Sequence, residues 1–225
     1  MDDTVEQVTK AATKFYDDLK CDENGRYRSW EYCYYNFYKA RKESEPDIDY
    51  LSLQLAFYLA SWGMYRGSSF LLQKDYKVHT PVVVEILKKK YDVLFGANCE
   101  DLCQEENLKL LEELNDFLIL YYEKIRHSVK GDLKTGLSET LITKILMGTL
   151  GCVPAYDRYF IAGIKASKVA VGSYKIKSVR QLAEFYNSNF EKLESAREHL
   201  LVEGMKYPQM KLLDMGFWQI GADME

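Results

Sequence analysis

The chain has few residues that interrupt a helix, with only 4 prolines and 13 glycines among its 225 residues. Between them, apolar side chains recur at three- and four-residue intervals, which is the spacing of an amphipathic helix, whereas strands alternate apolar and polar side chains. We therefore predict an all-α globular bundle of about 8–10 helices. A chain of this length can bury a sizeable core without disulfides or metal ions.

Long apolar runs are also missing. The longest stretch without Asp, Glu, Lys or Arg, from Tyr50 to Tyr65, has 16 residues, fewer than the roughly 20 that a membrane-spanning helix needs. No positively charged segment followed by an apolar one opens the chain, so a secretory signal is not expected. The five cysteines are odd in number and lack paired spacing, which favours a reducing compartment. We expect a cytoplasmic protein without membrane contact.

The signature motifs of common enzymes are absent as well. The sequence contains no glycine-rich phosphate loop, no His-Glu-x-x-His pair, no Gly-x-Ser-x-Gly elbow and no dinucleotide fingerprint. No arginine is followed five residues later by histidine, so the signature of the helical HEPN ribonucleases is missing. Cys99 and Cys103 lie four residues apart, but no second Cys or His pair completes a four-ligand zinc site. Neither a metal ion nor a cofactor is expected.

Capping and turn residues divide the chain into segments. Thr80-Pro81 is the clearest helix start, because a capping hydroxyl precedes proline at the first helical position, and Ser178 with Gln181 forms a capping box. The polar segment 128–136 is the predicted boundary between an N-terminal lobe, 1–127, and a C-terminal lobe, 138–225, unless the two form one continuous domain. The expected helices cover about residues 5–20, 30–38, 48–62, 81–95, 105–127, 139–146, 155–164, 178–202 (as a pair) and 208–220.

One segment has two interpretations. Residues 169–176 include Gly172-Ser173 between apolar and basic side chains, a pattern that fits either a short β-hairpin or a loop. At most one short hairpin is therefore expected in the all-α fold.

An arginine follows the most apolar predicted helix, in the segment Trp62-Gly-Met-Tyr-Arg66-Gly. A guanidinium next to a core helix needs a carboxylate, backbone carbonyls or an anionic ligand. Lys77 and His79 follow shortly before Thr80, whose helix N-terminus favours anions. Together these three side chains predict a phosphate pocket. The alternative is that Arg66 is structural and that Lys77 and His79 are ordinary loop residues.

A second segment leads from a helix that contains Lys144, through the loop Gly148 to Pro154, to Asp157 at the start of the next helix. An aspartate at this position caps free amides and complements the helix dipole, which alone explains its presence. The alternative is that Asp157 acts on a substrate.

This order of a lysine-bearing helix, a Gly/Pro loop and then Pro-x-x-Asp resembles the helix-hairpin-helix DNA glycosylases, especially the 8-oxoguanine branch. The resemblance covers the C-terminal half, including the closing segment Leu212 to Gly221, and agrees with an all-helical fold. It implies that Asp157 assists departure of a damaged base and that Lys144 is the candidate amine nucleophile. It also implies a nucleic-acid partner. The half could equally have lost catalysis and kept only binding.

Base extrusion needs aromatic side chains for stacking and cations for phosphates. Trp62, Tyr156 and Trp218 are the candidate stacking residues, although aromatic side chains also build ordinary cores. No acidic residue lies between Arg158 and Glu184, and this stretch includes the candidate phosphate ligands Arg158, Lys165 and Lys168, with Lys175, Lys177 and Arg180. In a chain with a net charge of −4, this local charge favours a polyanionic partner. A solvated basic loop is the alternative.

Three functions are compatible with the sequence. The first is a nucleic-acid-binding or nucleic-acid-acting protein with a glycosylase-like C-terminal half. The second is a non-enzymatic interaction or regulatory protein, in which the aromatic residues from Trp30 to Tyr38 form a partner groove or a homo-oligomer face. The third is a small-anion or nucleotide-binding enzyme that uses Arg66, Lys77 and His79. Convergence of Arg66 and Asp157 in one pocket would indicate a functional site.

Overall fold

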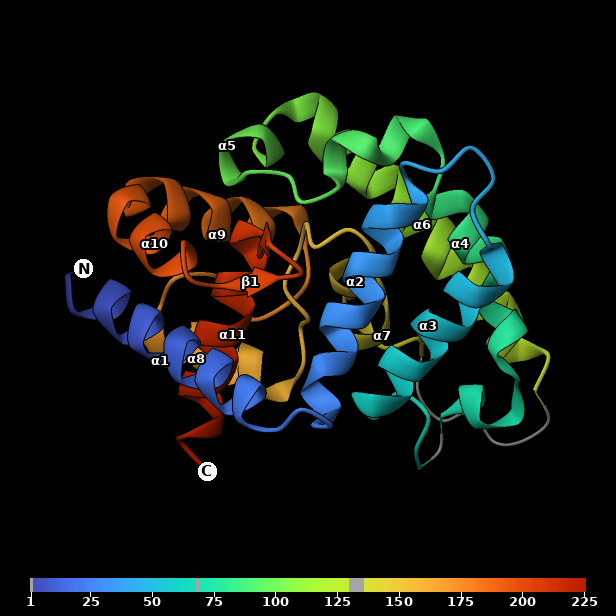
Figure 1. Cartoon of the computed structure of the whole chain (residues 1–225), viewed down its shortest axis with the longest axis horizontal. Coiled ribbons are helices and arrows are strands. Elements are labelled where there is room, and N and C mark those ends of the chain that lie inside the picture. The colour runs from blue at the N-terminus through green and yellow to red at the C-terminus, as the bar shows by residue number, and fades with distance from the viewer. Residues whose placement is uncertain (1, 68, 130–135) are drawn as a thin grey trace.

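Helices form nearly all of the regular structure in the computed structural model, which describes residues 2–67, 69–129 and 136–225 (Figure 1). The fold is all-α, as predicted. The described residues form eleven α-helices, more than the 8–10 expected, because several short helices were not predicted. The α-helices are α1 (Asp2–Cys21), α2 (Ser29–Ala40), α3 (Ile48–Ser61), α4 (Thr80–Ile86), α5 (Cys99–Leu102), α6 (Glu105–His127), α7 (Glu139–Thr149), α8 (Arg158–Ser167), α9 (Ile176–Ser188), α10 (Phe190–Arg197) and α11 (Gln209–Ala222).

Short elements connect these helices. Four 3-10 helices, η1 (Arg26–Arg28), η2 (Phe70–Gln73), η3 (Tyr76–His79) and η4 (Lys89–Leu94), occur among the described residues. The strands β1 (Leu201–Val202) and β2 (Met205–Lys206) pair antiparallel, with Leu201 opposite Lys206. Gly204 in their turn has φ +77°, a conformation that glycine adopts without strain.

Helix α11 packs against both α1 and α8, and two glycines allow the close approach to α8. A Cβ atom on Gly163 of α8 would lie 1.9 Å from the carbonyl oxygen of Phe217, and one on Gly221 of α11 would lie 2.0 Å from that of Tyr159. The backbones of the two helices therefore touch where these glycines face them. This contact fixes the relative position of Asp157, at the start of α8, and Trp218, in α11.

A second group of helices forms around α2, which packs against α3 and α7. Trp30 donates a hydrogen bond from Nε1 to the carbonyl oxygen of Met147 in α7 (3.0 Å), and its ring stacks on Tyr34. Trp30, Tyr34 and Phe37 are all buried. These three rings are therefore part of the core, whereas Tyr32 on the same helix is exposed.

The two predicted lobes share one hydrophobic core, which includes side chains from Val5 to Phe217. The N-terminal helix α1 packs on the C-terminal α11, whereas α7 packs on α2 and α3. The predicted boundary segment 128–136 falls mostly on residues 130–135, which lie outside the described residues. Figure 1 shows α1, α8, α9, α10 and α11 on one side of the molecule and α2, α3, α4 and α6 on the other.

Three local expectations need correction. Of the two interpretations of 169–176, the structure shows the loop, which bends up to the start of α9, and the hairpin lies instead at 201–206. The helix that begins at Thr80 ends at Ile86, and a 3-10 helix follows it. Ser178 lies inside α9 and donates a hydrogen bond to the carbonyl oxygen of Val171 (2.7 Å), so it does not cap a helix there.

Candidate functional site

A pocket of about 330 Å³ opens where the two groups of helices meet. It brings together most of the predicted chemistry, because Arg66 and Asp157 both line it. Two larger grooves, of about 710 and 610 Å³, contain none of the predicted site residues. The predicted site residues that line this pocket are Trp62, Arg66, Lys144, Asp157, Arg158 and Trp218, and the others are Arg26, Gly63, Met64, Thr140 and Tyr159.

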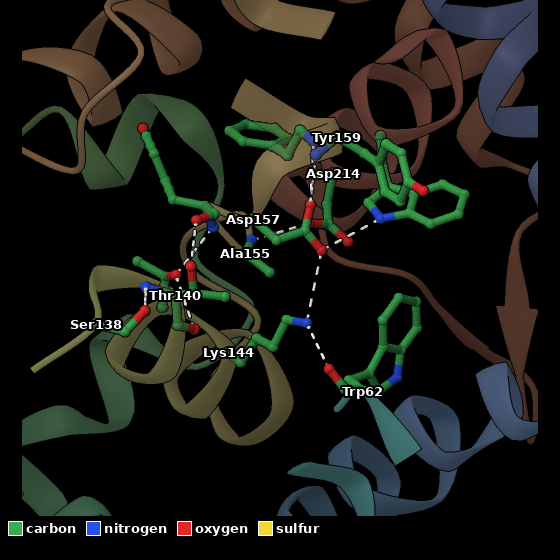
Figure 2. Close-up of polar contacts among 12 residues, drawn as sticks. Trp62, Ser138, Thr140, Lys144, Ala155, Asp157, Tyr159 and Asp214 are labelled. Carbon is green, nitrogen blue, oxygen red and sulfur yellow. Dashed lines mark hydrogen bonds and ion pairs between the residues drawn. The ribbon is translucent and has the colours of Figure 1, made fainter. Parts of the chain in front are cut away.

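Asp157 has two different oxygen environments. Its Oδ1 accepts hydrogen bonds from the backbone amides of Tyr159 and Phe160, both at 3.1 Å, and so caps α8. Its Oδ2 lies 3.3 Å from Nε1 of Trp218, which donates to it, and 3.5 Å from Nζ of Lys144 (Figure 2). The carboxylate therefore caps its helix with one oxygen and faces the lysine with the other.

Lys144 reaches the floor of the pocket from α7, with only 4% of its surface exposed. Its Nζ donates a hydrogen bond to the carbonyl oxygen of Trp62 (3.0 Å), as Figure 2 shows. Burial lowers the pKa of the Lys144 amine, and the charge of Asp157 opposes this effect. A lowered pKa increases the neutral fraction of the amine, which is the form that acts as a nucleophile.

Two indoles form an aromatic wall beside this pair. Trp62 ends α3 and Trp218 comes from α11, and their ring centroids lie 6.3 Å apart with the planes nearly perpendicular. Both side chains are partly exposed. Part of each indole is therefore accessible at the pocket.

Three arginines surround the opening, and each comes from a different segment. Arg66 follows α3 and folds back across Gly63, where φ is +79° and a Cβ would lie 2.9 Å from Nε of the arginine. No carboxylate of the described residues pairs with Arg26 or Arg66. Arg158 lies 3.4 Å from Oε2 of Glu225 at the exposed end of the chain. The opening of the pocket is therefore cationic.

The sequence analysis missed Arg26 and Tyr159. Arg26 lies in η1, directly after the Asn24-Gly25 turn, and only the packing of this connection brings it to the pocket. Tyr159 follows Arg158 in α8, and its ring lies 5.1 Å from that of Trp218. The sequence could have indicated Tyr159, because it is only two residues after Asp157, the predicted catalytic acid.

Three other predicted residues lie outside the pocket lining. Tyr156 is buried and donates a hydrogen bond to Oγ of Ser178 (2.7 Å), so its ring belongs to the core. Lys165 and Lys168 are exposed at the opposite end of α8 from Asp157, about 12–16 Å along the helix. The basic stretch therefore does not continue the cationic opening.

Lys77 and His79 do not join Arg66 in a phosphate pocket. His79 is fully buried, where Nε2 contacts the hydroxyl of Tyr65 (2.7 Å) and Nδ1 that of Tyr122 (2.6 Å). Burial lowers the pKa of His79 to about 3, so the ring is neutral at pH 7. Lys77 is exposed and lies 3.8 Å from the carboxylate of Asp49.

The buried histidine predicts an acid-sensitive fold. In the unfolded chain His79 takes up a proton below about pH 6.5, whereas in the folded chain it stays neutral down to about pH 3. Stability is therefore lost as the pH falls from 6.5 toward 3, by about 2–3 kcal/mol between pH 7.5 and 4.5. We expect urea unfolding of the His79→Gln variant to lack this part of the loss. If the wild type and His79→Gln lose the same stability between pH 7.5 and 4.5, His79 is not the cause of the loss.

A second ion pair lies beneath the pocket. Lys211 donates from Nζ to Oδ2 of Asp214 (2.8 Å), and both side chains are buried. Oδ1 of Asp214 accepts a hydrogen bond from the amide of Ala155 (2.8 Å), two residues before Asp157 (Figure 2). This pair therefore anchors the loop that presents Asp157.

Comparisons of the chain with protein-family models, with curated proteins and with solved structures give no significant match. Among the described residues, no cluster of three or more His, Cys, Asp and Glu side chains is arranged to hold a metal ion. None of the helices in the described part of the chain is both long and apolar enough to span a bilayer.

Proposed function

We propose that this chain binds nucleic acid, accommodates one base in the Lys144–Asp157 pocket and releases that base from its sugar. The convergence of Arg66 and Asp157 in one pocket is the observation that carries the proposal. The two residues belong to segments 91 positions apart, and a purely structural role for each gives no reason for them to meet. A pocket with perturbed titratable groups is where chemistry is expected.

The chemistry follows from the two groups on the floor. The neutral amine of Lys144 would form a C–N bond to the sugar carbon that carries the base, while the base leaves with the electrons of its broken bond and takes up the proton that the amine loses. Opening of the sugar ring would then give the imine that borohydride reduces. The carboxylate of Asp157 would stabilise the positive charge that develops on the sugar. The arginines at the opening would hold the flanking phosphates, and the indoles of Trp62 and Trp218 would contact the base.

Two other functions have less support. A protein partner on the aromatic side of α2 would need Trp30 and Tyr34, which are buried. A small-anion enzyme would need Lys77 and His79 beside Arg66, and neither lines the pocket. We also propose a cytoplasmic location, which agrees with the five free cysteine thiols.

The test is base release from oligonucleotides that carry damaged bases, including 8-oxoguanine, with borohydride to trap a lysine–sugar adduct. We expect Asp157→Asn to lower the release rate by at least about 100-fold and to retain binding. The fold should survive, because asparagine also caps helices. Lys144→Gln should abolish the trapped adduct.

Lys165→Gln is the matched control, since Lys165 is an exposed cation on the same helix as Asp157 and lies outside the pocket lining. It should release base at the wild-type rate. Wild-type activity in Asp157→Asn, or no release by the wild-type protein from any substrate in the panel, would overturn the catalytic proposal.

A further inference from the structure

Four aromatic rings form a compact row beside the pocket. Tyr27 contacts Trp62 with ring centroids 4.9 Å apart, Trp62 contacts Trp218 at 6.3 Å, and Trp218 contacts Tyr159 at 5.1 Å. Tyr27 also contacts Trp218 (5.9 Å), and the first three rings pack on the buried Phe15. Each of the four side chains is partly exposed. A row of accessible rings offers successive bases a surface for stacking, which does not depend on base identity.

An arginine stacks on each end of this row. The guanidinium carbon of Arg26 lies 4.9 Å from the ring centroid of Tyr27, and that of Arg158 lies 4.4 Å from the ring centroid of Tyr159. Nη2 of each arginine donates to the hydroxyl of the same tyrosine, and Nη2 of Arg158 also faces Oε2 of Glu225 (3.4 Å). The remaining N–H groups of each guanidinium can donate to phosphate oxygens. Arg66 adds a third cation at the opening of the pocket.

The pocket lining has an excess of positive charge. The lining carries four cations, Arg26, Arg66, Lys144 and Arg158, and one carboxylate, Asp157, a net charge of +3. The whole chain is −4, so the rest of it carries −7. The basic stretch from Lys165 to Arg180 does not continue the lining, so the cations available to a ligand in the pocket match a short anionic segment.

On the basis of the proposed function, we propose that the substrate is an unpaired segment of single-stranded nucleic acid, held by about three phosphates on Arg26, Arg66 and Arg158. In a duplex the bases stack on one another, so the faces of four aromatic side chains would have no partner. Duplex-binding proteins also commonly neutralise six or more phosphates, roughly twice the number of arginines here. Single strands match both the ring row and the small cationic footprint.

The test is the salt dependence of binding, measured by fluorescence anisotropy with labelled 12-nucleotide single strands of DNA and RNA and with the matching DNA duplex. Three phosphate contacts to a single strand predict that log K falls with log salt with a slope of about −2. Arg26→Gln and Arg66→Gln should each make this slope shallower by about 0.7. The duplex should bind at least about tenfold more weakly, a difference of about 1.4 kcal/mol.

Lys168→Gln is the control, because Lys168 belongs to the basic stretch but not to the pocket, and it should leave the slope unchanged. Glu225→Gln should strengthen binding, since Oε2 of Glu225 accepts from the hydroxyl of Tyr159 (3.0 Å) and faces Arg158. A slope of −5 or steeper, equal binding of the duplex, or an effect of Lys168→Gln equal to that of Arg66→Gln would overturn the inference.

The outcomes separate this inference from the proposed function. Single-strand binding with the expected slope but without base release would overturn the proposed reaction and leave the inference standing. Base release that requires a duplex would overturn the inference and leave the proposed reaction standing. A mononucleotide that binds as tightly as the 12-nucleotide strand would also overturn the inference and indicate a small-molecule ligand. No binding of any of these probes would overturn both.

Discussion

Gly163→Ala is expected to lower the free energy of unfolding by about 3–5 kcal/mol, although alanine is the better helix former by about 1 kcal/mol. The added methyl group would lie 1.9 Å from the carbonyl oxygen of Phe217. The nearest atom is a backbone oxygen at the contact between α8 and α11, so it cannot move aside as a flexible side chain could. The two helices must separate, and apolar contacts along their interface are lost.

The measurement is urea unfolding of the wild type, Gly163→Ala and Gly136→Ala under the same conditions. Gly136 is the control, because no heavy atom of the described residues beyond its chain neighbours lies within 4 Å of the position of its added Cβ, and its φ is not in the left-handed region. Gly136→Ala should therefore stay within about 0.5 kcal/mol of the wild type. A Gly163→Ala variant as stable as Gly136→Ala would show that the α8–α11 contact is looser than described.

The same substitution should weaken the site. Helix α8 begins at the residue after Asp157, and α11 contains Trp218, whose Nε1 lies 3.3 Å from the carboxylate. Separation of the two helices would lengthen this hydrogen bond. The glycine contact thus links the stability of the fold to the geometry of the pocket.

The helical fold could be predicted because it depends on local patterns. Apolar spacing and capping residues indicate where long helices run, and these signals are contained within each segment. The end of α4 at Ile86 was missed, because neither glycine nor proline marks it. Tyr91 and Leu94 in the following 3-10 helix are buried, so tertiary packing decides where this helix stops.

The hairpin at 201–206 had a local signal that was not used, and its first strand, Leu201–Val202, was assigned to the end of the predicted helical pair. Glu203-Gly204 is a two-residue turn in which both residues have positive φ, a conformation typical of hairpins. The residues from 203 to 207 were predicted to be a connection between two helices.

Part of the site could be predicted, because in two of its segments an apolar helix is followed by a turn that contains glycine. Arg66 and Asp157 follow such helices, and this placement singled them out. His79 was assigned to the same pocket by its position in the chain, yet Tyr65 and Tyr122 enclose it. Tyr122 lies 43 residues away in α6, and sequence spacing carries no information about that contact.

Lys211→Met is expected to lower the free energy of unfolding by about 3–5 kcal/mol, because it leaves the carboxylate of Asp214 buried without its ion-pair partner. Asp214 is only 6% exposed, and the amide of Ala155 would be its remaining contact. The ammonium of Lys211 also lies over the ring of Trp30, 4.7 Å from its centroid. Methionine keeps most of the side-chain volume, so the loss reports the charge and not a cavity.

The double variant Lys211→Met with Asp214→Asn separates the ion pair from the anchoring of the loop. Asparagine removes the buried charge and keeps an oxygen that accepts from the amide of Ala155, so we expect the double variant to recover at least about half of the loss. Urea unfolding with unchanged slopes is the measurement. Equal stability of the single and double variants would mean that Asp214 tolerates its charge without Lys211. The loop before Asp157 would then be held mainly by its own packing, because the paired charge beneath it would contribute little.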